Sequence, residues 1–267
     1  MKRINHSTLV LMWANSPLHY RHGVQHARPD TDATRLGRAV HCAILEPEMF
    51  ADRFAVKPDG MSFSTRDGKA WRSEHEHLTI LSHGDGCAIE GMVESVQDHA
   101  RARELLSLAP CETERRLEWT DEETGALCAG TPDRVIQASR PILLGIKTTR
   151  HIEPRRFEAE AYQRGYHLQW AYYHDALVAL GHAPPVMVEI AIENVAPYDV
   201  VVHVIPDEIL DDGRSAYRDA LVDVLRCREH DTWPGWCPTE RVFQRPRWAE
   251  TRDDDGLEDC TGVECDE

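Results

Sequence analysis

A chain of 267 residues, 42% of them hydrophobic and 28% charged, is long enough to bury a core as one elaborated domain. Its formal net charge of -16 is unfavourable for binding phosphates, but residues 250–267 alone hold nine acids against Arg252. Half of the net negative charge therefore lies in this terminal segment. With no run of eighteen apolar residues and no small-residue cleavage site near the start, the sequence predicts a cytoplasmic protein without a membrane span.

The first 110 residues are predicted to be mainly helical. One helix begins after Ser7, and a second apolar helical pattern runs through TRLGRAVHCAIL. Residues 55–74 mix Pro, Gly, Ser and charges, which predicts a loop leading into a helix at about Lys69. A further helix is predicted for 87–108.

From residue 111 the pattern changes to short β runs. TERRLEWT, ALCAGTPDRVIQA and PILLGIKTT, separated by DEETG and ASRP, predict a three-stranded meander. A helix over 153–180, the runs VMVEIAIENV and DVVVHVI, and a helix over 206–230 follow. We therefore expect 1–250 to be a single domain, whose part 111–250 is an α/β core with a central mixed sheet flanked by helices.

Two features at the chain level complete this prediction. The acidic segment 251–267 lacks apolar periodicity, so we expect it to be disordered and dispensable for folding. The eight cysteines contain no CxxC pair. They therefore signal neither a zinc knuckle nor a dense disulfide framework, and reduced thiols are favoured.

Asp133 and Lys147 are the residues that first indicate a metal-dependent hydrolase. Asp133 closes the run GTPD, and Lys147 lies on the next predicted strand in LLGIKTT, so a hairpin brings them side by side. Hydrolysis of a phosphodiester needs a divalent cation on hard oxygen ligands, and a positive charge near the nucleophile. A lysine at the end of a buried strand is uncommon without a function. Taken alone, Asp133 after Pro132 is also typical of a turn.

Five segments, in this order, resemble the RecE-like and RecB-like branch of the PD-(D/E)XK nucleases: GRAVHCAILEP, GTPDRV, LLGIKTT, YHLQWAYY and WPGWCPTERVFQRPRW. The resemblance covers most of residues 5–250. It implies a restriction-endonuclease-like core with an N-terminal helical elaboration. It also implies an exonuclease that uses Mg²⁺ or Mn²⁺ to digest one strand of linear duplex DNA, in the 5′-to-3′ direction, and yields single strands for recombination. A ring-like homo-oligomer, a tetramer, and a single-strand annealing protein as partner are further implications.

The same resemblance assigns roles to individual residues. His41 and Asp133 are expected to bind the metal together with the backbone carbonyl of Ile146, while Lys147 orients or activates the nucleophile. Without the motif around it, His41 is more typical of a hydrogen-bonded histidine than of a ligand. The motif favours the ligand.

Two further pairs of residues are assigned in this way. Gln169 and Tyr173 match a Q-x-x-x-Y signature and share one helix face, which places both beside the site. Glu114 or Glu118, on the preceding strand, is expected to supply a further acid.

Gly145 stands where the motif has its second acid, two residues before the lysine. Because residues 145 and 147 share a strand face, the missing carboxylate would have pointed into the site beside Lys147. Three explanations stay open: a mutated or engineered site, a degenerate nuclease that still binds DNA, or a carboxylate that has migrated to Glu153, Glu114 or Glu118. If the ancestral residue was Asp, Gly145→Asp should bind magnesium more tightly and cleave DNA faster, by a factor on the order of 10².

Basic residues at two places are predicted to contact DNA phosphates. Arg150 and Arg155 follow the lysine strand, and Arg66, Lys69 and Arg72 lie in the Ser- and Gly-rich segment. The alternative from another functional class is a catalytically inactive DNA-binding or regulatory protein on a nuclease fold. A restriction-like endonuclease is the third hypothesis.

Overall fold

The computed structural model describes residues 3–26, 29–237 and 239–245. The chain divides into two units, Met1–Gly235 and Trp236–Glu267, and the fold below is that of the first. The predicted acidic tail, 251–267, lies outside the described residues. Across the part of the chain that is described, no helix is long and apolar enough to span a bilayer.

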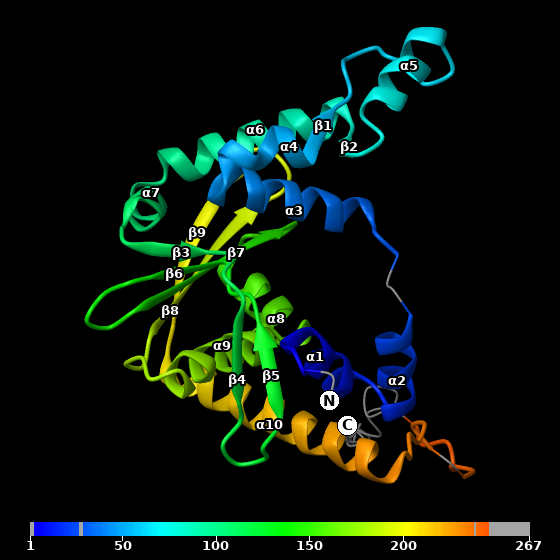
Figure 1. The fold of residues 1–267 in the computed structure, drawn as a ribbon, viewed down its shortest axis with the longest axis vertical. Coiled ribbons are helices and arrows are strands. Elements are labelled where there is room, and N and C mark those ends of the chain that lie inside the picture. Colours follow the sequence, from blue (N-terminus) through cyan, green and yellow to red (C-terminus); the bar gives the residue numbers. More distant parts are fainter. Residues whose placement is uncertain (1–2, 27–28, 238, 246–267) are drawn as a thin grey trace, which may run out of the picture. The chain divides into compact units, whose positions relative to one another are not determined.

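The first unit begins with consecutive helices, and most of its strands follow from residue 111 onward (Figure 1). In chain order the elements are α1 (His6–Ala14), α2 (Pro17–Gln25), α3 (Asp32–Leu45), the 3-10 turn η1 (Pro47–Met49), α4 (Phe50–Arg53), β1 (Phe54–Val56), α5 (Arg66–Glu74), β2 (Thr79–Leu81), α6 (His83–Asp98), α7 (Ala100–Ser107), β3 (Cys111–Thr113), β4 (Leu117–Thr120), β5 (Leu127–Gly130), β6 (Arg134–Ile136), β7 (Ile142–Thr149), α8 (Pro154–Gln163), α9 (Tyr166–Ala179), β8 (Val186–Glu193), β9 (Val200–Ile205) and α10 (Asp207–His230).

The central sheet has the strand order β3-β6-β7-β8-β9. Its middle pair, β7 and β8, is parallel, and the other neighbours are antiparallel. A parallel pair needs a long crossover, which α8 and α9 provide here. The predicted α/β fold with a mixed sheet flanked by helices is therefore confirmed.

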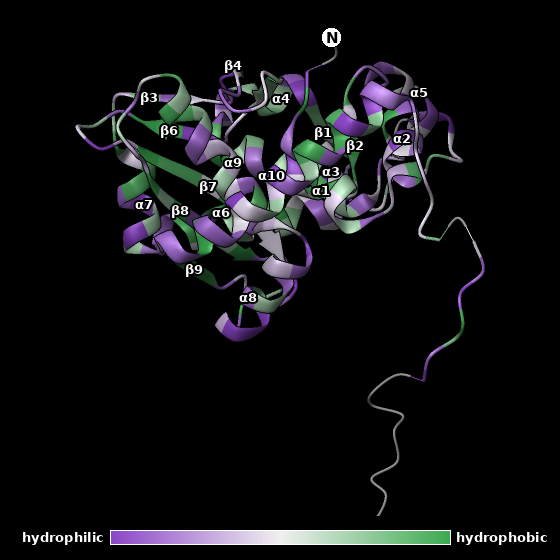
Figure 2. Ribbon diagram, turned by 90° about the horizontal axis from the view of Figure 1, so that it is seen from below, coloured by the Kyte–Doolittle hydropathy of each residue, from purple (hydrophilic) through white to green (hydrophobic). Residues whose placement is uncertain are grey.

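The two faces of this sheet bury different cores. On one face Leu144, Ile146 and Ile190 pack with residues of α3 and α6, and on the other Leu143 and Met187 pack with residues of α9 and α10. Figure 2 shows the hydrophobic colour concentrated on β7 and β8, with hydrophilic residues on the outer helices. Because side chains alternate along a strand, the odd-numbered residues of β7 face α9.

The predicted meander is wrong in one respect, because each of its first two runs is broken into two strands. The first run ends in β4 and only reaches the last residue of β3, which begins earlier, at Cys111, and the second run becomes β5 and β6. β4 and β5 then form a two-stranded sheet, in which β5 also makes a parallel bridge to Ile4, while β3 and β6 join the central sheet. Glu114, with a φ of 49°, turns the chain between β3 and β4, and Pro132 lies between β5 and β6.

The predicted helix over 153–180 is two helices. Gly165 separates α8 from α9 in the left-handed conformation, with a φ of 72°, which other residues adopt only at a cost. The predicted helix over 87–108 is likewise broken at His99, whose ring accepts the Ala102 N–H and caps α7. The parallel pair of β1 and β2 has no counterpart in the prediction.

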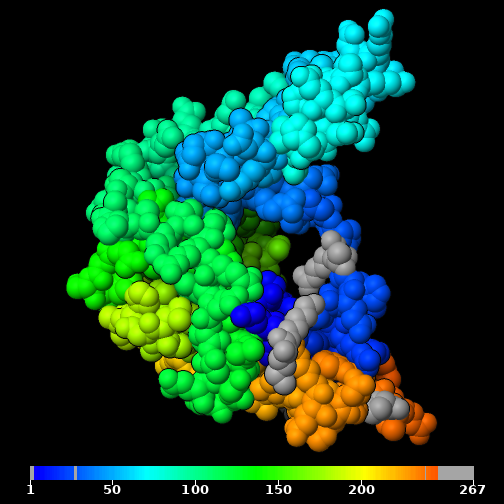
Figure 3. Space-filling model, viewed as in Figure 1, coloured from blue at the N-terminus to red at the C-terminus, as the bar shows by residue number. Residues whose placement is uncertain are grey.

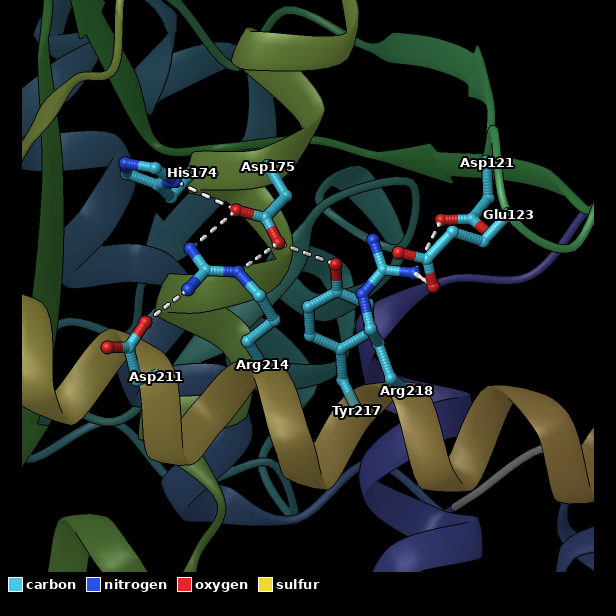
Figure 4. A network of polar contacts seen from close by, with 8 residues as sticks. All are labelled: Asp121, Glu123, His174, Asp175, Asp211, Arg214, Tyr217 and Arg218. Carbon is cyan, nitrogen blue, oxygen red and sulfur yellow. Dashed lines mark hydrogen bonds and ion pairs between the residues drawn. The ribbon is translucent and has the colours of Figure 1, made fainter.

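A partly buried polar network connects α9 to α10 (Figure 4). The carboxylate of Asp175 accepts hydrogen bonds from Arg214 Nε at 2.8 Å, Arg214 Nη2 at 2.9 Å and the Tyr217 hydroxyl at 2.6 Å. Its other neighbour is the His174 ring, at 2.9 Å. Burial opposes ionisation, but these hydrogen bonds outweigh it and hold the pKa of Asp175 well below its usual range. These contacts attach α9, which carries Gln169 and Tyr173, to α10.

Candidate metal centre

Asp133 lies where β6 stops pairing with β7. The last pair of that ladder is Arg134 with Leu144, and beyond it the Asp133 carboxylate accepts the Ile146 N–H at 2.8 Å. In a strand, the N–H and C=O of one residue point to the same side. The Ile146 carbonyl therefore opens toward the side of β7 on which Asp133 lies.

α3 brings His41 to the same point. Ala39 and Val40 of this helix are buried against the sheet, and His41 Nδ1 lies 3.7 Å from Asp133 Oδ2. The His41 ring also hydrogen-bonds the backbone of Ile146. Burial lowers the pKa of His41, and the charge of Asp133 opposes this only in part. A neutral imidazole is the form that binds a metal.

Glu114 completes a cluster with His41 and Asp133. Each residue offers one ligand atom, and these atoms all lie within 4.8 Å of one another. The Glu114 N–H donates to the Asp133 carbonyl at 3.0 Å, which holds the two acids together. Burial of its carboxyl and then the charge of Asp133 raise the pKa of Glu114 to about 7. Two acids that repel each other in this way are typical of a site that binds a cation.

The cluster opens to a cleft of about 570 Å³ that runs along α3. His41 and Glu114 line it together with Arg38 and Arg53. Figure 3 shows the surface hollowed beside this helix. The cluster is therefore accessible to a substrate from outside.

The donor set fits a hard divalent cation. Mg²⁺ holds oxygen ligands at about 2.1 Å, so that opposite ligands are about 4.2 Å apart. The donor atoms of His41, Glu114 and Asp133 all lie within 4.8 Å of one another, which is close to this spacing. The Ile146 carbonyl lies on the same side of β7. Imidazole with carboxylates suits Mn²⁺ as well as Mg²⁺.

Lys147 lies beside this cluster with 15% of its side chain exposed. Its ammonium is 3.4 Å from the Ile146 carbonyl, 3.8 Å from Glu189 Oε1 and 5.3 Å from the centre of the Tyr166 ring. Burial on its own lowers the pKa of Lys147, but attraction to Glu189 and Asp133 leaves the pKa above its ordinary value. The side chain is therefore a fixed positive charge at neutral pH.

Tyr173 and Gln169 lie together next to the cluster. The Tyr173 hydroxyl is 2.9 Å from His6 Nδ1 and donates to the Thr131 carbonyl at 3.1 Å, and Gln169 hydrogen-bonds Tyr173. Burial and then the charge of Asp133 raise the pKa of Tyr173 to about 12. The pair thus holds the chain segment that leads into Asp133.

His6 was missed by the sequence analysis. Burial and then the charge of Lys147 lower the pKa of this histidine to about 4, so its ring is neutral beside the site. It lies at the start of α1, far in sequence from the motifs, and no spacing pattern marks it. Only the contact with Tyr173 reveals its position.

Two of the three acids proposed to replace the one missing at position 145 lie elsewhere. Glu118 is exposed and paired with Arg3 and Arg116. The carboxylate of Glu153 caps α8 by accepting backbone N–H groups of its first turn. Among those three candidates, Glu114 is the one that reaches the cluster.

Glu189 is a fourth acid, on β8, that the sequence analysis did not consider. It is the register partner of Gly145, and its side chain is 1% exposed. A Cβ on residue 145 would lie 2.6 Å from Glu189 Oε2 and 2.7 Å from Oε1. The space that the sequence analysis assumed to be open for an Asp at 145 is therefore filled. Burial raises the pKa of Glu189 to about 7, and the charge of Lys147 opposes this rise.

The residues predicted to contact DNA lie at two places. Arg150 and Arg155 are exposed at the end of β7 and in the first turn of α8. Arg66, Lys69 and Arg72 are exposed on α5, which begins at Arg66 and so three residues before the predicted start of this helix at about Lys69. Their contact with DNA stays a prediction.

Comparisons with known proteins bear on the fold and the family of this chain. The model of the family DUF3799, described as a PDDEXK-like domain of unknown function, matches residues 6–244. No curated protein matches the chain. The crystal structure of the “Putative exonuclease” of Eubacterium rectale superposes with a TM-score of 0.63 at 12% identity, covering 91% of this chain and 90% of that one. That of SSO0001 reaches a TM-score of only 0.30 at 13% identity, over 81% and 84% of the two chains.

Proposed function

Because this chain belongs to the DUF3799 family of PDDEXK-like domains, and so to the PD-(D/E)XK superfamily, we propose that it is a metal-dependent deoxyribonuclease that digests one strand of linear duplex DNA from an end. The observation that carries the proposal is the convergence of His41, Glu114 and Asp133 beside the buried Lys147. The order of the RecE-like motifs supports exonucleolytic digestion, in the 5′-to-3′ direction, that yields single strands for recombination.

The residues of the cluster and the neighbouring Lys147 have different roles in the proposed reaction. Bound by His41, Glu114, Asp133 and the Ile146 carbonyl, Mg²⁺ or Mn²⁺ supplies a Lewis acid for the scissile phosphate. The Lys147 ammonium faces the same point and stabilises negative charge that develops there in the transition state. Because its pKa is raised, Lys147 acts as an electrostatic group and does not accept a proton.

Binding of DNA is assigned to the exposed basic residues. Arg150 and Arg155 follow the lysine strand directly, and we propose that they contact the backbone next to the scissile phosphate. The basic residues of α5 contact the duplex farther away. A ring-like homo-oligomer and a single-strand annealing partner belong to the same proposal.

A digestion assay tests the proposal. Linear duplex DNA with a 5′ label should lose the label in the presence of Mg²⁺, EDTA should stop the reaction, and covalently closed circular DNA should stay intact. Asp133→Asn is the matched control, since it removes one charge from the cluster and keeps the side-chain shape. Nicking of the circular DNA would favour an endonuclease.

Gly145 favours one rival function, a non-catalytic DNA-binding or regulatory protein, because the acid of the motif is absent there. The same assay separates the two. Retention of labelled duplex DNA in a mobility-shift experiment, with no Mg²⁺- or Mn²⁺-dependent loss of label, would favour the rival.

A further inference from the structure

We propose that Glu189 takes the place of the acid that position 145 lacks, and that it does so from the neighbouring strand. This inference rests on the proposed function and names a further residue of the same site. Glu189 lies outside the three-residue cluster, so we assign it as a positioning residue. Its carboxylate holds Lys147 and adds negative charge to the cation site.

The register of the central sheet places Glu189 correctly for this role. Gly145 pairs with Glu189, and Lys147 pairs with Ala191, in the parallel ladder of β7 and β8. Partners in a parallel ladder have their side chains on the same face of the sheet. Glu189 therefore projects from the face that a side chain at 145 would share with Lys147.

The Glu189 carboxylate also lies close to the position expected for the missing one. An Asp places both carboxylate oxygens about 2.4 Å from its own Cβ, by standard bond lengths. The two oxygens of Glu189 lie 2.6 Å and 2.7 Å from the Cβ position of residue 145. The carbon of the Glu189 carboxylate lies 2.9 Å from the same Cβ position, so the longer side chain from β8 places its carboxylate next to the space that a shorter one from β7 would occupy.

One oxygen of the Glu189 carboxylate is held by a hydrogen bond, and the other has no hydrogen-bond partner. Trp170 Nε1 donates to Oε2 at 2.6 Å. Oε1 is buried, has no hydrogen-bond partner, and lies 3.8 Å from the Lys147 ammonium. An unpartnered oxygen of a carboxylate that is 1% exposed is costly, unless a cation or a donor faces it. Lys147 and a divalent ion beside Asp133 are such partners.

Gly145 is explained by the same geometry. At under 3 Å from the Glu189 oxygens, any Cβ at position 145 would force the carboxylate to shift from the place it has in the structure. We therefore expect glycine at position 145 to occur with glutamate at position 189, and an acid at 145 to occur with a smaller residue at 189. The glycine makes room for the acid of the neighbouring strand.

The first experiment measures Mn²⁺ binding to the full chain by titration calorimetry, in the absence of DNA. Glu189→Gln keeps the shape and an oxygen for Trp170 but removes the charge. We expect Mn²⁺ affinity to fall about tenfold or more, as for other groups that support metal ligands, and kcat to fall about 10²-fold with little change in KM. Glu94→Gln, exposed on α6, is the matched control and should change neither quantity.

The second experiment moves the carboxylate back to β7. Gly145→Asp alone and Glu189→Ala alone should each weaken Mn²⁺ binding, the first by crowding and the second by loss of charge. The double variant should bind Mn²⁺ within about tenfold of the original chain, because it restores one carboxylate in the same space. A merely structural role for Glu189 predicts no such rescue.

Two results would overturn the inference alone: Mn²⁺ binding and cleavage by Glu189→Gln that equal those of the original chain, or a double variant no better than the worse single one. Failure of the original chain to bind Mn²⁺ at all would overturn the proposed function together with it. If Glu189→Ala unfolds, the isosteric Glu189→Gln decides the question.

Discussion

The carboxylate of Asp133 accepts a hydrogen bond from the N–H of Ile146, just beyond the last residue pair between β6 and β7. The side chain continues the ladder of the sheet by one hydrogen bond, and the same oxygen lies 3.7 Å from the His41 ring. Structural and chemical roles therefore meet in one group, and substitution can separate them.

Asp133→Asn is expected to keep an oxygen for the Ile146 N–H and to lose the charge. Stability should stay near that of the original chain, while cleavage of linear duplex DNA should fall by about 10²-fold or more. Asp133→Ala loses the hydrogen bond as well, and should be less stable by about 1–3 kcal/mol. Thermal unfolding and Mg²⁺-dependent digestion measure the two effects. Rapid cleavage by Asp133→Asn would show that another residue holds the ion.

Lys147→Met should separate metal binding from catalysis. Removing a positive charge beside the cluster should leave Mn²⁺ affinity unchanged or higher, while cleavage falls by about 10²-fold. Because Glu189 then lacks its counter-charge, the free energy of unfolding should fall, by up to about 3 kcal/mol. Calorimetry and single-turnover cleavage test the separation. A parallel loss of Mn²⁺ affinity would mean that Lys147 organises the ligands.

Glu114→Gly should weaken metal binding without destabilising the fold. A left-handed backbone costs a residue other than glycine about 1–2 kcal/mol, and Gly costs about 0.5–1 kcal/mol of entropy, so Tm should be equal or slightly higher. Mn²⁺ affinity should fall because a ligand is lost. Glu114→Gln, which keeps the backbone strain, is the control. A clear drop in Tm for the glycine variant would contradict this account.

Asp175→Asn should destabilise the chain in a pH-dependent manner. Because the folded pKa of Asp175 is lowered, its contribution is complete above the unfolded pKa of about 3.9 and is lost as the pH falls toward the folded value. Urea unfolding should show a deficit of about 1–3 kcal/mol at pH 7 that shrinks below about pH 4. Asp223→Asn, an exposed partner of Arg226, should show no such trend. A deficit that is independent of pH would indicate a packing effect instead.

Replacement of Arg66, Lys69 and Arg72 by Ala should weaken DNA binding and leave Mn²⁺ affinity unchanged. Each lost phosphate contact makes the slope of log K against log salt shallower by about 0.9. Fluorescence anisotropy with labelled duplex DNA at several salt concentrations measures this slope. Arg101→Ala with Arg103→Ala on α7 is the control. An unchanged slope in the α5 variant would remove this helix from the DNA-binding surface.

The motifs allowed the residues close to Asp133 and Lys147 to be predicted, because that hairpin is local in sequence. Glu189 could not be found in this way, because its relation to Gly145 depends on which residue of β8 pairs with it. One signal was present. A glutamate in the otherwise apolar run VMVEIAIE is costly to bury without a partner. The pattern alone does not say where that partner lies.

The interruptions of strands and helices were harder to predict than the elements themselves. Gly165 lies inside a helical pattern, where glycine is often tolerated, so the pattern does not mark the left-handed turn that the structure has there. Glu114 has no residue-type preference for the left-handed region, so the division of the hairpin into two sheets was not visible in the sequence.

The division of these strands between two sheets also gives the cluster of His41, Glu114 and Asp133 a structural role. Glu114 lies in the connection from β3 to β4, and Asp133 lies in the connection from β5 to β6. Each acid therefore lies in one of the two chain segments that connect the small sheet to the central one. An ion bound by both acids would hold the two sheets together. The β4–β5 hairpin is also held by Leu117 and Cys128, which are buried in one core with residues of α9. The ion would add to this attachment, and the packing that steadies the hairpin would in turn favour binding of the ion.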